Sequence, residues 1–438
     1  MPPRLSFGSI CSRCSIYRRQ FSTFRPQNHQ SAPSLPSLPS LPPLAGYARL
    51  PTRALIALTG KDSTDFLQGL VTQNLLTPQN RPVPKNGFYA AFLNAPGRVL
   101  HDVFIYPVPP NDSYNGTSDI AYLIEVDKNE VTNLMKHMRK HKLRAKLAFR
   151  AMDEGELNVF SLWNEEDAGM MTEYDFQLEN GKSPPFTCVD TRAPGFGFRF
   201  LAPEKVVNEQ PIMPGEMVDF ATYNLRRILH GVPEGQGEII RESALPMECN
   251  LDIMGGIDFH KGCYTGQELT IRTHHRGVVR KRILPVQLYD VDEPMPETDM
   301  PNYSSESKLV LPPTGANIAK VSSRKGRSAG KFLSGVGNIG LALCRLEMMT
   351  DIAFTEESSQ YSPDQEFKIS WEADAEAGVE EAGELKVKAL VPPWTRDYIV
   401  SGGVKKPTLP PQKSDEEVAE ELEKLDATIK EIERQRGE

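Results

Sequence analysis

The chain has 438 residues and a formal net charge of −8 at neutral pH, from 50 Lys and Arg against 58 Asp and Glu. At about 150 residues per domain, this length allows two or three domains. No run approaches the ~18 apolar residues of a membrane span, so a transmembrane protein is excluded and no insertion of a spanning segment is expected. Six Cys are too few for a disulfide scaffold. The mild acidity makes nucleic acid an unlikely partner.

The N-terminal segment is basic, because the first acidic residue is Asp62 and arginines are spread among Ser, Phe, Ile and Leu at positions 4, 13, 18, 19 and 25. Such a segment is typical of a transit peptide, so we expect delivery to the mitochondrial matrix and cleavage after Phe21 or slightly later. A disordered basic tail is the alternative. Three Ser-Leu-Pro repeats over 34–42 predict an extended linker. Transit peptide and linker therefore occupy 1–44, and the Cys11/Cys14 pair within them carries no functional weight.

The next part, 45–289, alternates strand and helix patterns and is expected to form one α+β domain with a largely antiparallel sheet. A turn at Ala95-Pro96-Gly97 predicts a hairpin, and Asp62 is placed to cap a helix. Strands are expected at 53–58, 87–94, 98–106, 120–126, 143–150 and 157–163, and helices after Asp62 and at 128–142 and 217–230.

Beyond Tyr289 the composition changes. The segment 290–330 is rich in Pro, Ser, Glu and Lys, which favours a disordered insertion. Short strands in 331–402, including 367–371 and 385–391, predict a small C-terminal β-barrel. The end of the chain, 403–438, is interpreted as a linker and a charged helical tail, which folds onto the body, frays in solvent or binds a partner.

Residues Pro246 to Asp252 alternate polar and apolar side chains. As a strand, they would place Glu248, Asn250 and Asp252 on one face. Two carboxylates and an amide in a row suit a polar pocket that accepts N–H donors from a planar heterocycle. The solvent-facing half of an edge strand explains the alternation equally well.

Cys263 lies in the octapeptide KGCYTGQE. Thr265 and Glu268 have the spacing of a capping box, so a helix is expected to begin there. A helix N-terminus and the nearby Lys261 would favour the thiolate of Cys263. The alternative is that this thiol only packs, as most free cysteines do. No pairing of ligands makes a secure metal site, and no stably bound iron–sulfur cluster is expected on the chain alone.

Two basic stretches, 136–146 and 276–282, stand out. His137 and His141 have a spacing that can hold zinc, but without a nearby third ligand a solvated helix face is favoured. The second stretch suits phosphates or an acidic ligand tail, or it protects an exposed strand edge.

The octapeptide, with the PxExNxD frame at 246–252 and Gly255-Gly256-Ile257, resembles the signature of mitochondrial iron–sulfur cluster assembly factors related to the glycine-cleavage T-protein, an aminomethyltransferase. The resemblance extends to 66–69, to 92–100 and to Gly337-Asn338-Ile339-Gly340-Leu341-Ala342. It covers most of 45–400. The leader and the Pro/Ser-rich insertion look like a fungal elaboration of this family.

This resemblance implies a T-protein-like fold: ferredoxin-like lobes around a central pocket that suits tetrahydrofolate, and a C-terminal β-barrel. It implies support of late 4Fe–4S protein maturation, with aconitase-type and lipoate-synthase-type apo-proteins as targets and A-type carrier proteins as partners. The fold is transferase-like, but no catalytic reaction is secure.

The resemblance also implies roles for individual residues. The signature is Lys261, Gly262, Cys263, Tyr264, Thr265, Gly266, Gln267 and Glu268, in which Cys263 would handle cluster or sulfur or shape the pocket. Folate would contact Glu248, Asn250, Asp252 and Arg272. The transferases carry an acidic pair after the hairpin turn; here it is His101-Asp102, so Asp102 alone matches their catalytic Asp. The alternatives are a one-carbon transferase with Asp102 as general base and a folate-assisted RNA-binding or RNA-modifying protein.

Overall fold

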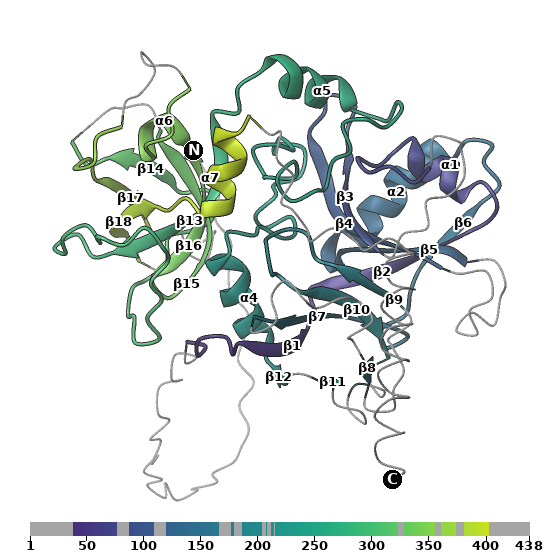
Figure 1. Cartoon of the computed structure of the whole chain (residues 1–438), viewed down its shortest axis with the longest axis horizontal. Helices are drawn as coiled ribbons and strands as arrows, with labels where there is room; N and C mark the ends of the chain where they lie inside the picture. Colours follow the sequence, from purple (N-terminus) through teal and green to yellow (C-terminus); the bar gives the residue numbers. More distant parts are fainter. Residues whose placement is uncertain are drawn as a thin grey trace, which may run out of the picture. The chain divides into compact units, whose positions relative to one another are not determined.

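A computed structural model describes residues 38–76, 87–108, 120–165, 177–178, 186–203, 207, 212–213, 215–322, 328–354, 361–373 and 381–402 (Figure 1). The expected transit peptide, Cys11 and Cys14, and the charged tail lie outside these residues. Within the described part, no helix is both long enough and apolar enough to cross a bilayer.

The first sheet has the order β3-β4-β5-β2-β6, and its neighbouring strands are antiparallel. It is covered by α1 and by α2, which follows a 3₁₀ turn at Lys128–Glu130. Leu134 and Met138 of α2 are fully buried four residues apart, as expected for a helix that packs one face on a sheet. The bounds are β2 Arg53–Thr59, α1 Ser63–Gln68, β3 Phe88–Leu93, β4 Val99–Pro107, β5 Ile120–Asp127, α2 Val131–Lys142 and β6 Ala148–Ala151.

The second sheet has the order β12-β1-β7-β10-β9. The helix expected over 217–230 begins only at Phe220, because Glu216–Val218 form a strand that pairs in parallel with β1. Asp219 caps the helix by accepting a hydrogen bond from the Thr222 amide at 2.8 Å. The bounds are β1 Ala45–Arg49, β7 Asn158–Asn164, β9 Phe186–Val189, β10 Phe198–Ala202, β12 Glu216–Val218 and α4 Phe220–Leu229; β8 Gln177–Leu178 and β11 Ile212–Met213 pair separately.

The C-terminal strands close a barrel in the order β13-β16-β15-β14-β17-β18, as expected. A disordered insertion was expected over 290–330. The structure differs, because β14 lies within this segment and pairs with β15 and β17. The bounds are β13 Lys281–Tyr289, β14 Asn317–Lys320, β15 Gly330–Val336, β16 Ile339–Arg345, α6 Leu346–Met349, β17 Phe367–Trp371, β18 Gly383–Ala389 and α7 Pro393–Val400.

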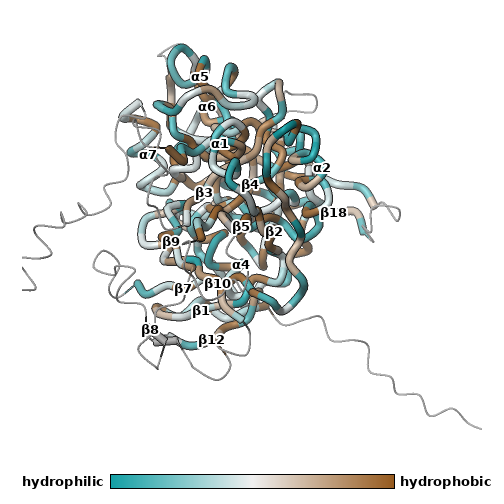
Figure 2. Tube along the Cα trace, turned by 90° about the vertical axis from the view of Figure 1, so that its right-hand side faces the viewer, coloured by the Kyte–Doolittle hydropathy of each residue, from teal (hydrophilic) through white to brown (hydrophobic). Residues whose placement is uncertain are grey.

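Hydrogen bonds join the barrel to the segment after α4, and the residues before β1 to the second sheet and to Tyr303. Ser334 of β15 donates to Glu238 at 2.6 Å. Contacts of the described chain begin before the expected start at Ala45: Pro39 accepts from the Tyr303 hydroxyl at 2.6 Å, and Pro43 from the Trp163 indole at 2.9 Å. Figure 2 shows hydrophobic segments along the strands of the first sheet and hydrophilic ones along α5 (Gln267–Arg276).

Candidate functional site

The octapeptide forms a turn that leads into α5 and is held against the end of α1. Lys261 donates from Nζ to the carbonyl oxygens of Gln68, Val71 and Gln73 at 2.8, 2.6 and 2.9 Å. The Thr265 amide also donates to the carbonyl of Gly69 at 3.0 Å. Lys261 therefore fixes the turn on α1, rather than serving chiefly as a counter-charge for a thiolate.

Helix α5 begins one residue later than the expected capping box. Its N-cap is Gly266, with φ +81°, and no side chain caps it. The Thr265 hydroxyl instead points to the Gly69 carbonyl at 3.4 Å, and the Gln267 side chain accepts from the Tyr264 amide at 3.1 Å. The capping box prediction was wrong because Gly266 adopts the left-handed conformation that L side chains avoid.

Cys263 differs from the other cysteines that the structure describes. It is exposed, whereas Cys188, Cys249 and Cys344 are buried, and burial raises the pKa of those three thiols. A thiol must be accessible to react or to bind metal. Among the described residues, Cys263 alone meets that condition, and it stands next to Gly262, beside which space is open.

The strand predicted over Pro246–Asp252 is wrong. These residues form consecutive turns, with the Cys249 amide bonded to Leu245 O and the Leu251 amide to Pro246 O. Asn250 has φ +63°, which interrupts an extended chain. Glu248, Asn250 and Asp252 therefore do not share a strand face.

Two of these polar residues instead face β13. Asn250 donates to the Ile283 carbonyl at 2.6 Å. Arg282 binds both carboxylate oxygens of Asp252, at 2.9 and 2.8 Å, and donates to the Met247 carbonyl at 2.9 Å. Asn250 and Asp252 are 1% and 8% exposed, so their observed role is to hold this loop on the barrel.

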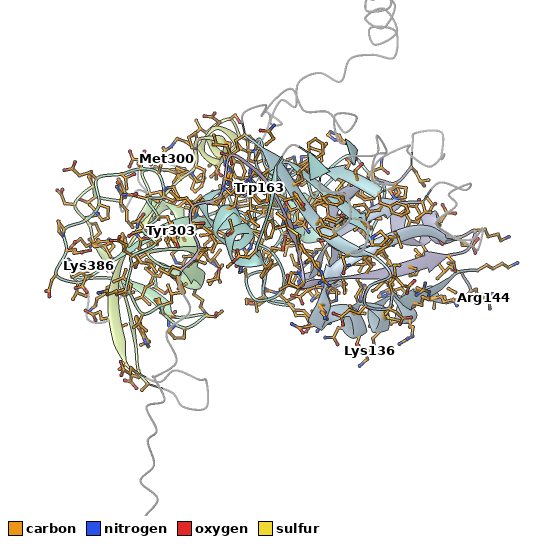
Figure 3. All side chains as sticks on the ribbon, turned by 90° about the horizontal axis from the view of Figure 1, so that it is seen from below. Lys136, Arg144, Trp163, Met300, Tyr303 and Lys386 are labelled. Carbon is orange, nitrogen blue, oxygen red and sulfur yellow. The ribbon has the colours of Figure 1, made fainter. Side chains whose placement is uncertain are left out.

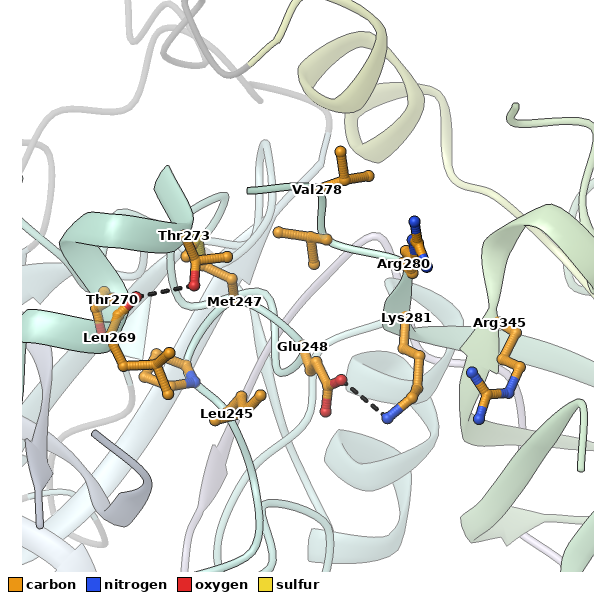
Figure 4. Close-up of a pocket in the computed structure, with 12 residues that line it drawn as sticks. Leu245, Met247, Glu248, Leu269, Thr270, Thr273, Val278, Arg280, Lys281 and Arg345 are labelled. Carbon is orange, nitrogen blue, oxygen red and sulfur yellow. Dashed lines mark hydrogen bonds and ion pairs between the residues drawn. The ribbon is translucent and has the colours of Figure 1, made fainter. Parts of the chain in front are cut away.

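Glu248 lines a cavity of about 260 Å³ between the loop, α5 and the start of β13 (Figure 4). Its carboxylate lies 3.0 Å from Lys281 Nζ. Apolar groups form much of the wall, and the Thr270 hydroxyl, which is buried, has no hydrogen-bond partner among the described residues. The lining is Leu245, Pro246, Met247, Glu248, Leu269, Thr270, Thr273, Val278, Val279, Arg280, Lys281 and Arg345.

Asp102 lies in β4 and is fully buried. It accepts from Arg53 at 3.2 Å, from the Gly235 amide at 3.3 Å and from Gln236 at 3.3 Å. Its carboxylate is therefore held by three donors and does not line the cavity beside Glu248. Arg272 of α5 is exposed and does not line that cavity either.

Sequence reasoning missed a buried network of charges next to Asp102. Arg53 and Arg199 both bind Glu125, and Arg199 and Arg192 both bind Glu234. Burial raises the pKa of Glu234, but Arg199, Arg192 and Arg53 outweigh it and hold that pKa well below its usual value. The sequence signal that could have revealed this network is a single arginine inside an apolar strand, such as Arg199 in β10.

The two basic stretches lie in different places. The first, 136–146, does not line the cavity, and the second, 276–282, lines it in part. The rings of His137 and His141 are 4.4 Å apart, and the Nδ1 of His141 is bonded to the His137 carbonyl. In the described part of the chain, no group of three or more His, Cys, Asp and Glu is arranged to hold a metal ion. From the second stretch, Arg280 and Lys281 reach the cavity, whereas Arg282 is buried against Asp252.

The fold belongs to the aminomethyltransferase T-protein class. The crystal structure of the glycine cleavage system aminomethyltransferase T from Bartonella henselae matches 80% of this chain and 86% of its own, with a TM-score of 0.50 and 13% identity. The family described as CAF17, C-terminal beta-barrel domain, matches residues 280–397, which hold the barrel and the first part of α7.

Sequence relatives define the family more closely. The chain is 57% identical over 413 residues to the mitochondrial iron–sulfur cluster assembly factor IBA57 homolog of Coccidioides immitis, covering 92% of this chain and 95% of that protein. The homologs of Aspergillus oryzae and Neurospora crassa are 53% and 43% identical, covering 97% and 81% of this chain and 98% and 82% of their own lengths. The chain belongs to the IBA57 family of mitochondrial iron–sulfur cluster assembly factors.

Proposed function

We propose that this protein is a mitochondrial assembly factor for iron–sulfur clusters and works in the matrix. The names of its relatives support this role. The observation that carries it in this chain is the exposed thiol of Cys263 on a turn that Lys261 anchors to α1. A thiolate is a preferred ligand of iron–sulfur clusters. The turn presents this sulfur at the surface, where a partner protein reaches it.

The same proposal names the clients by their chemistry. The protein receives or holds a cluster, as cargo, together with an A-type carrier protein and supports maturation of 4Fe–4S apo-proteins of the aconitase and lipoate-synthase types. One cysteine cannot ligate a cluster that needs four protein ligands, so the remaining thiolates come from the carrier. The protein thus contributes a positioned sulfur and a docking surface.

The test is cluster transfer with the full chain and an A-type carrier, followed by iron and acid-labile sulfide analysis. Cys263→Ala is expected to lower the cluster content of the complex, and aconitase activity and protein lipoylation in cells. The control is His260→Ala, because the His260 side chain is 99% exposed three residues away. Equal cluster content and target activities in wild type and Cys263→Ala would remove this thiol from the mechanism.

Folate dependence is proposed on narrower grounds, the T-protein-like fold and Glu248 at the wall of the cavity. The other expected contacts do not fit as a set, because Asn250 and Asp252 face β13 and Arg272 does not line the cavity. We therefore derive no step through folate. Equilibrium dialysis of tetrahydrofolate is expected to show binding that Glu248→Gln weakens. Absence of binding to the wild-type chain would rule folate out.

A one-carbon transferase with Asp102 as general base is the alternative activity. It requires a carboxylate within reach of substrate, and the full burial of Asp102 beside Arg53 does not favour it. Turnover of an aminomethyl donor by the purified protein, lost in Asp102→Asn, would establish the activity. The RNA alternative requires salt-dependent affinity for mitochondrial tRNA.

A further inference from the structure

The outward side of α2 and the turn after it are strongly basic. Between Val131 and Met152 the chain has no Asp or Glu. None of the exposed or half-buried cations in this stretch forms an ion pair with another described residue, apart from Arg150. We call the following set the α2 basic surface: Lys136, Arg139, Lys140, Lys142, Arg144 and Lys146. Figure 3 shows Lys136 and Arg144 pointing away from the body.

A single large apolar side chain lies within this surface. Leu143, which ends α2, is 89% exposed and stands between Lys142 and Arg144. Its backbone has φ +44° and ψ −112°, a conformation that is costly for any residue with a side chain. Glycine is the usual residue at such a helix end. The structure therefore holds an apolar side chain in water, in a strained conformation, with a cation on either side of it in the sequence.

The inner face of α2 fixes this surface in place. Leu134 and Met138 are fully buried in the core between α2 and the first sheet. The Lys146 amide is bound by the Asp62 side chain at 2.7 Å, which ties the turn after Leu143 to the start of α1. The cations and Leu143 are thus presented by a rigid element rather than by a free tail.

We propose that the α2 basic surface rests on a bilayer that carries anionic phospholipids, with Leu143 entering the boundary between headgroups and acyl chains. Cations near an anionic membrane and an apolar side chain beneath them are the two components of peripheral membrane binding. Lys and Arg stems lie along the interface while their charges reach the phosphates. The chain lies on the membrane and does not span it.

Other partners fit these observations less well. Protein interfaces bury an apolar core and are depleted in Lys, whereas this surface offers one apolar side chain among six cations. Single-stranded nucleic acid stacks on exposed aromatic rings. Phe149, beside this surface, is half-buried between the core and Arg139, which lies 5.9 Å from the ring centroid. The His137 and His141 rings of α2 lie against each other, with their centroids 4.4 Å apart.

The test places a fluorescent reporter at the proposed contact in the full chain. Leu143→Trp is mixed with vesicles of phosphatidylcholine and phosphatidylglycerol whose acyl chains carry bromine, a contact quencher of Trp emission. We expect loss of emission with these vesicles and none with brominated phosphatidylcholine alone. Adding Lys140→Gln, Lys142→Gln and Arg144→Gln is expected to abolish the loss, because the surface charge that draws the site to the membrane is removed.

The matched control is Val310→Trp. Val310 is also exposed, at 62%, and Lys308 is exposed nearby, but both lie outside the α2 basic surface. Its emission is expected to stay constant, which separates contact at α2 from binding of the basic N-terminal segment. Equal quenching at both positions, quenching that survives the three Gln substitutions, or no quenching would overturn the proposal. So would a blue shift of the Leu143→Trp emission with tRNA or polyglutamate but not with vesicles.

Discussion

Arg282 and Asp252 form a buried two-bonded ion pair that joins the barrel to the loop beside the cavity. Their side chains are 5% and 3% exposed, and the guanidinium bridges both carboxylate oxygens. A two-bonded geometry of this kind is specific to arginine, because lysine presents a point charge. The pair therefore fixes the loop that carries Glu248.

Breaking this pair is expected to destabilise the fold. Asp252→Asn leaves the Arg282 charge buried without its partner, and such losses cost about 3–5 kcal/mol. Urea unfolding of the full chain measures the change in free energy. The control is Glu384→Gln, which breaks the more exposed pair with Lys368 and is expected to cost less than about 1 kcal/mol. Equal effects of the two substitutions would contradict the structural role of the buried pair.

Lys261→Met is expected to loosen the octapeptide turn. The substitution removes three hydrogen bonds, to the carbonyl of the last residue of α1 and to two carbonyls after it. Hydrogen bonds from a charged donor contribute roughly 1.5–3 kcal/mol each. Hydrogen exchange is expected to accelerate at the Thr265 amide, which bonds to Gly69. Lys61→Met, at an exposed position, serves as control. Unchanged exchange at Thr265 would show that Lys261 does not hold the turn.

Gly97→Ala is expected to separate the β3–β4 turn from α5. An added Cβ would lie 2.9 Å from the Gly266 carbonyl oxygen and 3.0 Å from Leu269 Cβ, and φ is +83°. Gly155 has a similar φ, +94°, but open space beside it. Gly155→Ala thus measures the backbone cost alone, about 1–2 kcal/mol, and Gly97→Ala should exceed it in urea unfolding. Equal losses would mean that the turn moves away from α5 without cost.

His101 is expected to make the fold sensitive to acid. Burial, followed by Arg241 and His137, lowers its pKa from 6.5 to about 3. Glu130 lies 3.6 Å from Nδ1, and neither ring nitrogen has a hydrogen-bond partner among the described residues. The unfolded chain binds the proton more readily, so this contribution to stability is complete above pH 6.5 and is lost as the pH falls toward 3.

His101→Leu is therefore expected to flatten the dependence of unfolding free energy on pH between these limits, by roughly 3–5 kcal/mol in total. At pH 7 the variant should be about as stable as the wild type, since it removes unpaired buried nitrogens. Urea unfolding at several pH values checks both statements. His260→Leu, at an exposed ring, should leave the slope unchanged. An unchanged slope in His101→Leu would show that His101 is not a source of the acid sensitivity.

Much of the fold follows from local patterns. Apolar runs identified the strands around the hairpin at Ala95-Pro96-Gly97 and the barrel strands β17 and β18. The patterns failed where a distant partner decides the conformation. The alternation of polar and apolar residues over 246–252 is compatible with a strand and with the observed turns. The positive φ of Asn250 and its hydrogen bond to Ile283 decide for the turns, and neither is visible in the local pattern.

The candidate site was predictable in part. Spacing and composition singled out Cys263, and the structure places it at the surface. The partners of Lys261 are 188 to 193 residues away in sequence, so no local pattern reveals them. For the same reason, no local pattern reveals that the set expected around a folate separates in space. Glu248 lines the cavity, Asn250 and Asp252 face β13, and Arg272 is exposed outside both places.

Strand β13 has a mechanical consequence. The Ile283 amide donates to the Glu248 carbonyl at 2.9 Å, and Arg282 grips the same loop. The first barrel strand is thus hydrogen-bonded directly to the loop that forms the cavity wall. A partner protein that displaces the barrel would therefore move Glu248 as well, and so change the shape of the cavity.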